Sequence, residues 1–300
     1  MKKLLLLIVL LGQTVFAQQI DVKSIELLKG TETGGYHFAV YSPQGGYLLT
    51  SSANYTGLQQ ITLATGEVKT ITKEPGAGYD VKISADGLTI LFKKTEFINN
   101  LRYTSLHQYS FTDNKTTKIE SATRDKITPA FAQNEPMHVK GNKNLVKSAK
   151  AMVTTPFVTI EDMKMVLYSG NTSKIITPNG ADASYFWASV SPDGKHIVYA
   201  TAHQGTFVCN TDGTNVVSLG KLNAPVWLNN RWVVGMDDKD DGEQVLSSSI
   251  IALSIDGKTR QTLSTPSIKI AMYPAASPDG KQIAFENEKG QIYLMNINIK

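Results

Sequence analysis

One short pattern occurs four times along this chain and restricts what it can fold into. Each copy has a serine, a proline or alanine, a glutamine or aspartate and a glycine, followed by an apolar run; the copies are YSPQGGYLLT around Ser42, ISADGLTILF around Ser84, VSPDGKHIVYA around Ser191 and ASPDGKQIAF around Ser277. Glycine and small polar residues between two strand-like runs are typical of a β-hairpin turn. Each copy is therefore predicted to join two antiparallel strands.

The spacing of the copies predicts the number of repeat units. Ser42 and Ser84 are 42 residues apart, and Ser191 and Ser277 are 86 apart, which leaves room for a degenerate copy at APVWLNNRWVVGM. The 107 residues between Ser84 and Ser191 fit two steps if one carries an insertion, with the missing copy starting near TPAFAQNEPM and resuming at MVTTPFVTIED. This spacing predicts six units.

A second hairpin follows the first in each unit, as in LQQITLATGEVKTIT and SIIALSIDGKTRQTLS, and segments with a helical period are essentially missing. Four-stranded antiparallel units that repeat every 40 to 45 residues or so are typical of a β-propeller. We expect an all-β, six-bladed propeller that forms a single domain over residues 18–300. The last unit is one strand short, so residues 22–29 are predicted to supply its outermost strand and close the ring.

The pattern SPDGKQIAF followed by GQIYLMN resembles the WD40-like repeats of the TolB-like propellers and of the propellers in prolyl-oligopeptidase-type enzymes. The resemblance extends over nearly all of residues 18–300. It implies the fold, whereas the same blades serve both binding proteins and enzymes. The additional α/β domains that these relatives carry before or after the propeller are not expected here.

The first residues, MKKLLLLIVLLGQTVFAQ, combine two lysines with an apolar run that is too short to span a bilayer. Val15 and Ala17 are small residues at the positions that a signal peptidase reads. We therefore expect a signal peptide over residues 1–17, export to the periplasm or beyond, and no transmembrane segment. Loss of Lys2 and Lys3 leaves 28 basic against 26 acidic residues, which argues against a general nucleic-acid surface. The lone Cys209 is expected to be a small buried apolar residue.

Motifs for catalysis are missing: the chain has no G-x-S-x-G and no H-E-x-x-H. Its five histidines, namely His37, His107, His138, His196 and His203, are scattered without ligand spacing. In the acidic stretch MDDKDDGEQ, Lys239 occupies a position where a calcium loop needs a ligand. No catalytic residue, metal site or cofactor is predicted, and the acidic stretch is interpreted as a solvated loop.

One face of the ring is the predicted binding surface. In an up-and-down blade, the loop between the second and third strands lies on the same face as the connection to the next blade. The acidic stretch is such a loop, and the connections carry aromatic residues. The candidate binding residues are Tyr185, Trp187, Trp227, Asp237, Asp238, Asp240 and Asp241. Tyr36, Tyr79 and Tyr273 are expected to wedge between blades, and the lysines of residues 140–150 form a second, basic candidate patch.

Two functions fit these observations. The first is a non-enzymatic propeller that binds a protein or a cell-envelope component, such as a glycan, through this face. The second is a glycan lyase or hydrolase with its site at the mouth of the central channel. Histidine and carboxylate side chains that converge on the channel would favour the enzyme.

Overall fold

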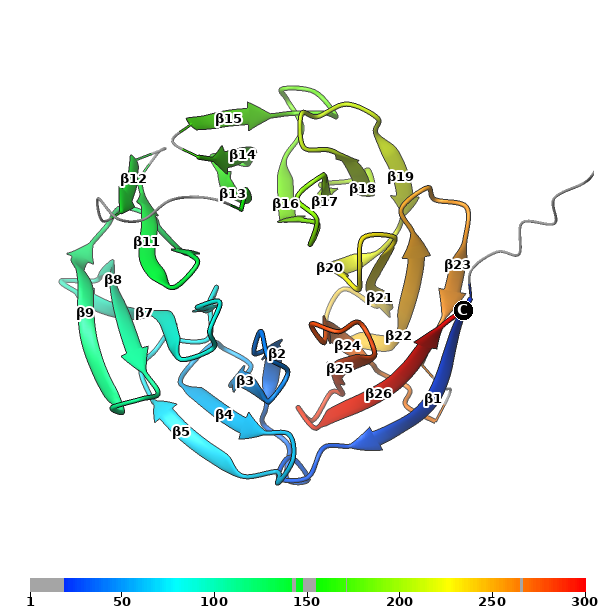
Figure 1. Cartoon of the computed structure of the whole chain (residues 1–300), viewed down its shortest axis with the longest axis horizontal. Helices are drawn as coiled ribbons and strands as arrows, with labels where there is room; N and C mark the ends of the chain where they lie inside the picture. The colour runs from blue at the N-terminus through cyan, green and yellow to red at the C-terminus, as the bar shows by residue number, and fades with distance from the viewer. Residues whose placement is uncertain (1–18, 142–143, 148–154, 171, 265–266) are drawn as a thin grey trace, which may run out of the picture.

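The chain folds into a ring of antiparallel sheets around a central axis (Figure 1). The computed structural model describes residues 19–141, 144–147, 155–170, 172–264 and 267–300, and the expected signal peptide lies outside these ranges. Within the described ranges, no helix is long and apolar enough to cross a bilayer.

The sheets are the blades of the propeller, and each is named here by its order in the chain. Blade 1 contains β2 (His37–Tyr41), β3 (Tyr47–Ser51), β4 (Leu58–Thr62) and β5 (Val68–Thr72); blade 2 contains β6 (Lys82–Ile83), β7 (Thr89–Ile98), β8 (Leu101–Ser110) and β9 (Lys115–Thr123). Blade 3 contains β10 (Ile127–Ala132), β11 (Glu135–Lys140) and β12 (Asn144–Lys147); blade 4 contains β13 (Phe157–Glu161), β14 (Lys164–Ser169) and β15 (Thr172–Ile176). Blade 5 contains β16 (Tyr185–Val190), β17 (His196–Thr201), β18 (Gly205–Asn210) and β19 (Val217–Gly220); blade 6 contains β20 (Asn223–Trp227), β21 (Trp232–Asp240), β22 (Val245–Ser254) and β23 (Arg260–Thr262). Blade 7 contains β24 (Met272–Ala276), β25 (Gln282–Glu286), β26 (Ile292–Ile299) and β1 (Ile20–Leu27).

The propeller has seven blades, so the prediction of six is wrong. The region near TPAFAQNEPM and MVTTPFVTIED, predicted to be one interrupted unit, contributes to two separate sheets: Ile127–Ala132 is the first strand of blade 3 and Phe157–Glu161 is the first strand of blade 4. Their first hairpins close through two-residue turns without glycine, in which Gln133, Asp162 and Met163 adopt left-handed backbone angles. The repeated serine-to-glycine pattern is therefore missing at both positions.

The N-terminal strand closes the ring, as predicted, although it spans Ile20–Leu27 and not residues 22–29. β1 pairs with β26 from Ile20 opposite Ile299 to Leu27 opposite Tyr293, so the first and last described strands share one sheet (Figure 1). Ile20 is 1% exposed and packs in the same apolar cluster as Met295 and Ile297. Closure by pairing removes the open edge that β26 would otherwise present.

The repeated turn satisfies its own polar groups. In blade 5, the Ser191 hydroxyl donates to Asp193 Oδ1 at 2.6 Å and accepts the His196 N–H at 3.0 Å; Ser84 bonds to Asp86 and Thr89 in the same way in blade 2. The glycine of each turn has a positive φ, for example 73° at Gly194, where a side chain would be strained. These turns lie on one face of the ring, called here the first-turn face.

Cys209 is fully buried beside Ile197 and Tyr199, and burial raises the pKa of its thiol to about 12. Since the thiolate is the reactive form, the native thiol should be inert toward Ellman's reagent at pH 8. One equivalent of thiol should react after unfolding in guanidinium chloride. A native thiol that reacts as fast as free cysteine would contradict this burial.

Candidate functional site

Five blades carry a strained residue in or beside their first strand. Phe38, Asp80, Trp187, Ala224 and Tyr273 all have left-handed backbone angles, with φ between 47° and 59°. In four of these blades the pairing of the first and second strands shifts register at this point, as between Phe186 and Ser189 in blade 5. A bulge of this kind re-aims a side chain. All five residues line one central cavity.

The cavity occupies the axis of the ring and has a volume of about 860 Å³. The first strand of every blade contributes to its wall, from β2 in blade 1 to β24 in blade 7. This volume lies within the range of roughly 300–1,000 Å³ that is usual for pockets that hold small ligands.

Four aromatic rings gather at one end of the cavity and are called here the mouth cluster: Phe38, Tyr55, Tyr79 and Tyr273. The Phe38 ring stacks on Tyr55 at 4.2 Å and meets Tyr273 edge-on at 4.8 Å, while Tyr55 meets Tyr79 at 5.3 Å. Tyr55 lies in the loop between β3 and β4, and Tyr79 lies in the connection from blade 1 to blade 2. In blade 1, the second loop and the inter-blade connection therefore share a face as predicted, and this is called the second-loop face.

Two of the cavity's aromatic rings remain open to solvent. Trp187 is 42% exposed and Tyr79 is 49% exposed. The Trp187 ring packs edge-on against Phe186 at 5.0 Å, which leaves indole surface free within the cavity wall. An exposed aromatic side chain held on a strained backbone is a common feature of binding sites.

The charged groups of the cavity lie on the side of blades 2 and 3. Among the described lining residues they are Asp80 and three lysines, Lys82, Lys93 and Lys126, which we call the lysine cluster. Asp80 bonds to Lys82 at 2.7 Å and to Lys93 at 3.4 Å, and the Lys93 ammonium also lies 4.4 Å from the centre of the Tyr79 ring.

The pKa values of this group follow from burial and pairing. Burial alone would raise the pKa of Asp80, but Lys82 and Lys93 outweigh it and hold that pKa below its ordinary value. Burial lowers the pKa of Lys93, and Asp80 offsets only part of this effect. The wall here carries more positive than negative charge.

A buried carboxylate fixes the bulge at Phe38 from behind. Glu286 is 1% exposed; one of its oxygens accepts the Phe38 N–H at 2.6 Å and the other bonds to His37 Nδ1 at 2.8 Å. Burial raises the pKa of Glu286, and the hydrogen bond from His37 opposes that change. Sequence reasoning missed this pair because the two residues are far apart in the chain.

Of the three aromatic candidates, the structure brings only Trp187 to the cavity. Tyr185 is fully buried, and its hydroxyl donates to the Gly180 carbonyl at 3.0 Å and accepts the Asn179 N–H at 2.9 Å. Trp227 donates from Nε1 to the Ser189 carbonyl at 3.1 Å and packs between blades 5 and 6. Tyr185 and Trp227 therefore hold the fold together, whereas Tyr79 and Tyr273, expected to wedge between blades, line the cavity.

The four aspartates lie on the hairpin of β21 and β22, and strand β21 runs through Asp240 rather than ending before the acidic stretch. Asp237 pairs with Arg260 at 2.7 Å, and the buried Asp238 accepts a hydrogen bond from Asn223 at 2.7 Å.

Asp240 and Asp241 are exposed and accept N–H groups of their own turn at about 3.0 Å. Backbone hydrogen bonds hold the pKa of Asp241 below its usual value. Within the part of the chain that is described, no group of three histidine, cysteine, aspartate or glutamate side chains could hold a metal ion.

Only part of the basic candidate patch over residues 140–150 lies within the described residues. Lys140 pairs with Glu120 at 3.0 Å, while Lys143 and Lys150 lie outside the described residues.

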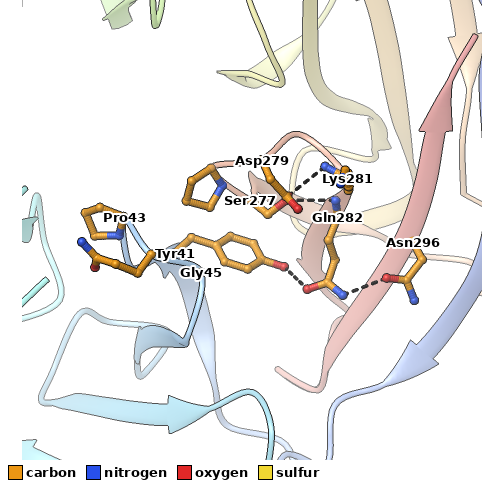
Figure 2. A pocket seen from close by; sticks show the side chains of 10 residues that line it. Tyr41, Pro43, Gly45, Ser277, Asp279, Lys281, Gln282 and Asn296 are labelled. Atoms are coloured by element: carbon orange, nitrogen blue, oxygen red, sulfur yellow. Dashed lines mark hydrogen bonds between the residues drawn. The ribbon is translucent and has the colours of Figure 1, made fainter. Parts of the chain in front are cut away.

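A second cavity of about 500 Å³ lies between blades 7 and 1, next to their first turns (Figure 2). The Tyr41 hydroxyl donates to Gln282 Oε1 at 2.7 Å, and Gln282 Nε2 donates to Asn296 Oδ1 at 2.9 Å. These polar groups satisfy one another across the junction of the first and last blades. We interpret this cavity as part of the ring closure.

No protein-family model and no curated protein sequence matches this chain. Solved structures do resemble it. A putative TolB from Agrobacterium tumefaciens is 14% identical with a TM-score of 0.55, over 95% of this chain and 99% of that one. TolB from Acinetobacter baumannii is 15% identical with a TM-score of 0.55, over 85% and 65%. A chain of a mitotic checkpoint complex is 11% identical with a TM-score of 0.58, over 99% of both. At these identities the likeness defines the class of fold, a β-propeller, and nothing finer.

Proposed function

We propose that the protein is an exported, non-enzymatic propeller that binds a protein or a cell-envelope component at the mouth of its central channel, on the second-loop face. Export is inferred from the signal-like N-terminus. The observation that carries the proposal is the set of strained backbone positions that turn Phe38, Trp187 and Tyr273 into the cavity. Backbone strain of about 1–3 kcal/mol per residue persists only where the surrounding structure imposes it, and it clusters at functional sites. The exposed Asp240 and Asp241 at the tip of the β21–β22 hairpin form part of the proposed rim.

The alternative is a glycan lyase or hydrolase at the same mouth. A general acid and a general base must both reach one substrate. Among the described lining residues, the carboxylate is Asp80, which is paired with lysines, and the His37–Glu286 pair lies behind Phe38. This arrangement supports binding better than acid–base catalysis.

Replacement of Trp187 by glycine tests the proposal. The change removes the ring and also relieves the positive φ of 50°, so the strain that is released offsets part of the packing lost against Phe186. Affinity for the captured component should fall by at least about 30-fold, as for a central anchor residue. The component would be captured from envelope extracts with the parent chain, purified, and titrated by calorimetry against both proteins.

Leu88→Ala is the matched control, because Leu88 is 51% exposed at a first turn on the other face. It should leave the affinity unchanged. Equal affinity of the parent and Trp187→Gly proteins would contradict binding at this mouth.

A further inference from the structure

The charged residues of the central cavity lie on one side of it and are mostly positive. Three ammonium groups and one carboxylate line the wall at blades 2 and 3, and the remaining described lining residues carry no formal charge. Lys82 and Lys126 both lie close enough to Lys93 to lower the pKa of its ammonium group. A ligand with negative charge would relieve this repulsion.

The partners of Lys93 leave it under-neutralised. Its side chain is 9% exposed, its contact with Asp80 is a long 3.4 Å, and Asp80 is shared with Lys82 at 2.7 Å. Its other contacts among the described residues are the Ile127 carbonyl at 3.4 Å and the Tyr79 ring at 4.4 Å, neither of which carries a formal charge. Lys126 donates to the Ile160 carbonyl. A partly desolvated ammonium of this kind favours a carboxylate as an added acceptor.

The inner strands are poorly suited to pairing with a peptide backbone. Prolines stand in the first strands at Pro129, Pro225 and Pro274, where they remove N–H donors, and the last two directly follow strained bulge residues. What the cavity offers instead is ring faces and ammonium groups. The negative face of an aromatic ring attracts the weakly positive C–H groups of a sugar ring.

From these features we infer that the ligand of the channel is an acidic saccharide, with its carboxylate at the lysine cluster and its sugar rings against the aromatic side chains of the mouth. This inference rests on the proposed function, because it names the chemistry of the component that the mouth binds. The volume of about 860 Å³ has room for several sugar rings.

The test is a calorimetric titration of the full mature chain with a tetrasaccharide of glucuronic acid. The same tetrasaccharide with its carboxylates reduced to alcohols is the neutral probe, and tetraglutamate is the peptide probe. The acidic sugar should bind at least about tenfold more tightly than either, as expected for charge-assisted hydrogen bonds. Its affinity should fall as salt is raised.

Two lysine variants assign the contact. Lys93→Met and Lys126→Met should each weaken binding of the acidic sugar by about tenfold or more while leaving the neutral sugar unaffected. Lys195→Met is the matched control, since this side chain is 74% exposed at a first turn on the other face. Because Lys126 is exposed, its variant is expected to fold normally even if the loss of the buried Lys93 disturbs the fold.

Each outcome decides the inference. Equal affinity for the acidic and reduced sugars, or tighter binding of tetraglutamate, would overturn it, and so would an unchanged affinity of both lysine variants. A different result would contradict the proposed function, namely that the Trp187→Gly protein binds the captured component as tightly as the parent does. A component that requires Trp187 but is not displaced by the acidic sugar would overturn the ligand class alone.

Discussion

A chain of residues 28–300 should aggregate under conditions in which a chain of residues 18–300 stays in solution. β26 (Ile292–Ile299) would still pair with β25, but its outer edge would be left open. Exposed edges of this kind pair with other chains. The core would also lose Ile20 from its contacts with Met295 and Ile297. Light scattering and size-exclusion chromatography of the purified chains measure the effect.

Point variants in the same strand test this prediction with smaller changes. Ile20→Ala should cost about 2–5 kcal/mol of unfolding free energy, as for other large buried aliphatic residues. Leu27→Ala is the control, because Leu27 is 39% exposed at the other end of the strand, and it should cost less than about 0.5 kcal/mol. Equal urea midpoints for Ile20→Ala and the parent, or a shortened chain that stays monomeric, would show that the ring is stable without this strand.

The strands that sequence reasoning located correctly are those with a self-contained turn. Ser84 and Ser191 each stabilise a hairpin through hydrogen bonds to residues at most five positions away. The sequence pattern of the turn is therefore recognisable without knowledge of the fold. The closing strand was also predictable, because the last repeat unit ends one strand short while an unassigned strand-like segment precedes the first unit. Both inferences depend on hydrogen bonds that a short stretch of sequence must satisfy.

The count of blades failed where that local signal is missing. In blade 4, Asp162 and Met163 close the first hairpin with left-handed angles of 48° and 59°, a geometry that usually selects glycine or asparagine. In blade 3, Gln133 takes the same role. Contacts with neighbouring blades hold these turns, so the turn residues carry no sequence signal of a hairpin. The sequence between Ser84 and Ser191 therefore predicts one long blade where the structure has two.

The site was only partly predictable because bulges break the alternation of side chains. In a regular strand Trp187 would face an adjacent blade, as Tyr185 does, but its positive φ turns it into the cavity. A usable signal did exist: Phe38, Asp80, Trp187 and Tyr273 all stand four residues before the serine of the repeated turn. In blade 6 the corresponding position, four residues before Leu228, is Ala224; Trp227 stands three residues after it and packs between blades.

Replacement of Glu286 by alanine should cost about 3–5 kcal/mol of unfolding free energy, because it leaves the Phe38 N–H and the His37 ring without their buried partner. Glu286→Gln is the matched control, since its amide oxygen still accepts from Phe38, and it should lose much less. Urea denaturation followed by tryptophan fluorescence measures both. The alanine variant should also bind the captured component more weakly, since Phe38 belongs to the mouth cluster.

The glutamine variant also tests the titration of this carboxyl. Burial raises the pKa of Glu286 above its ordinary value of 4.5, so the folded chain holds this proton more tightly than the unfolded chain does. Its contribution to stability is therefore complete below 4.5 and is lost as pH rises through the folded-state pKa. The unfolding free energy of the parent minus that of Glu286→Gln should fall as pH rises through the folded-state pKa of Glu286. The aspartates of the turns, such as Asp86 and Asp193, have lowered pKa values, so their contribution to stability is lost in the opposite direction, as pH falls. A difference that is flat or rises with pH would mean that Glu286 is already ionised in the folded state and that its hydrogen bonds outweigh its burial.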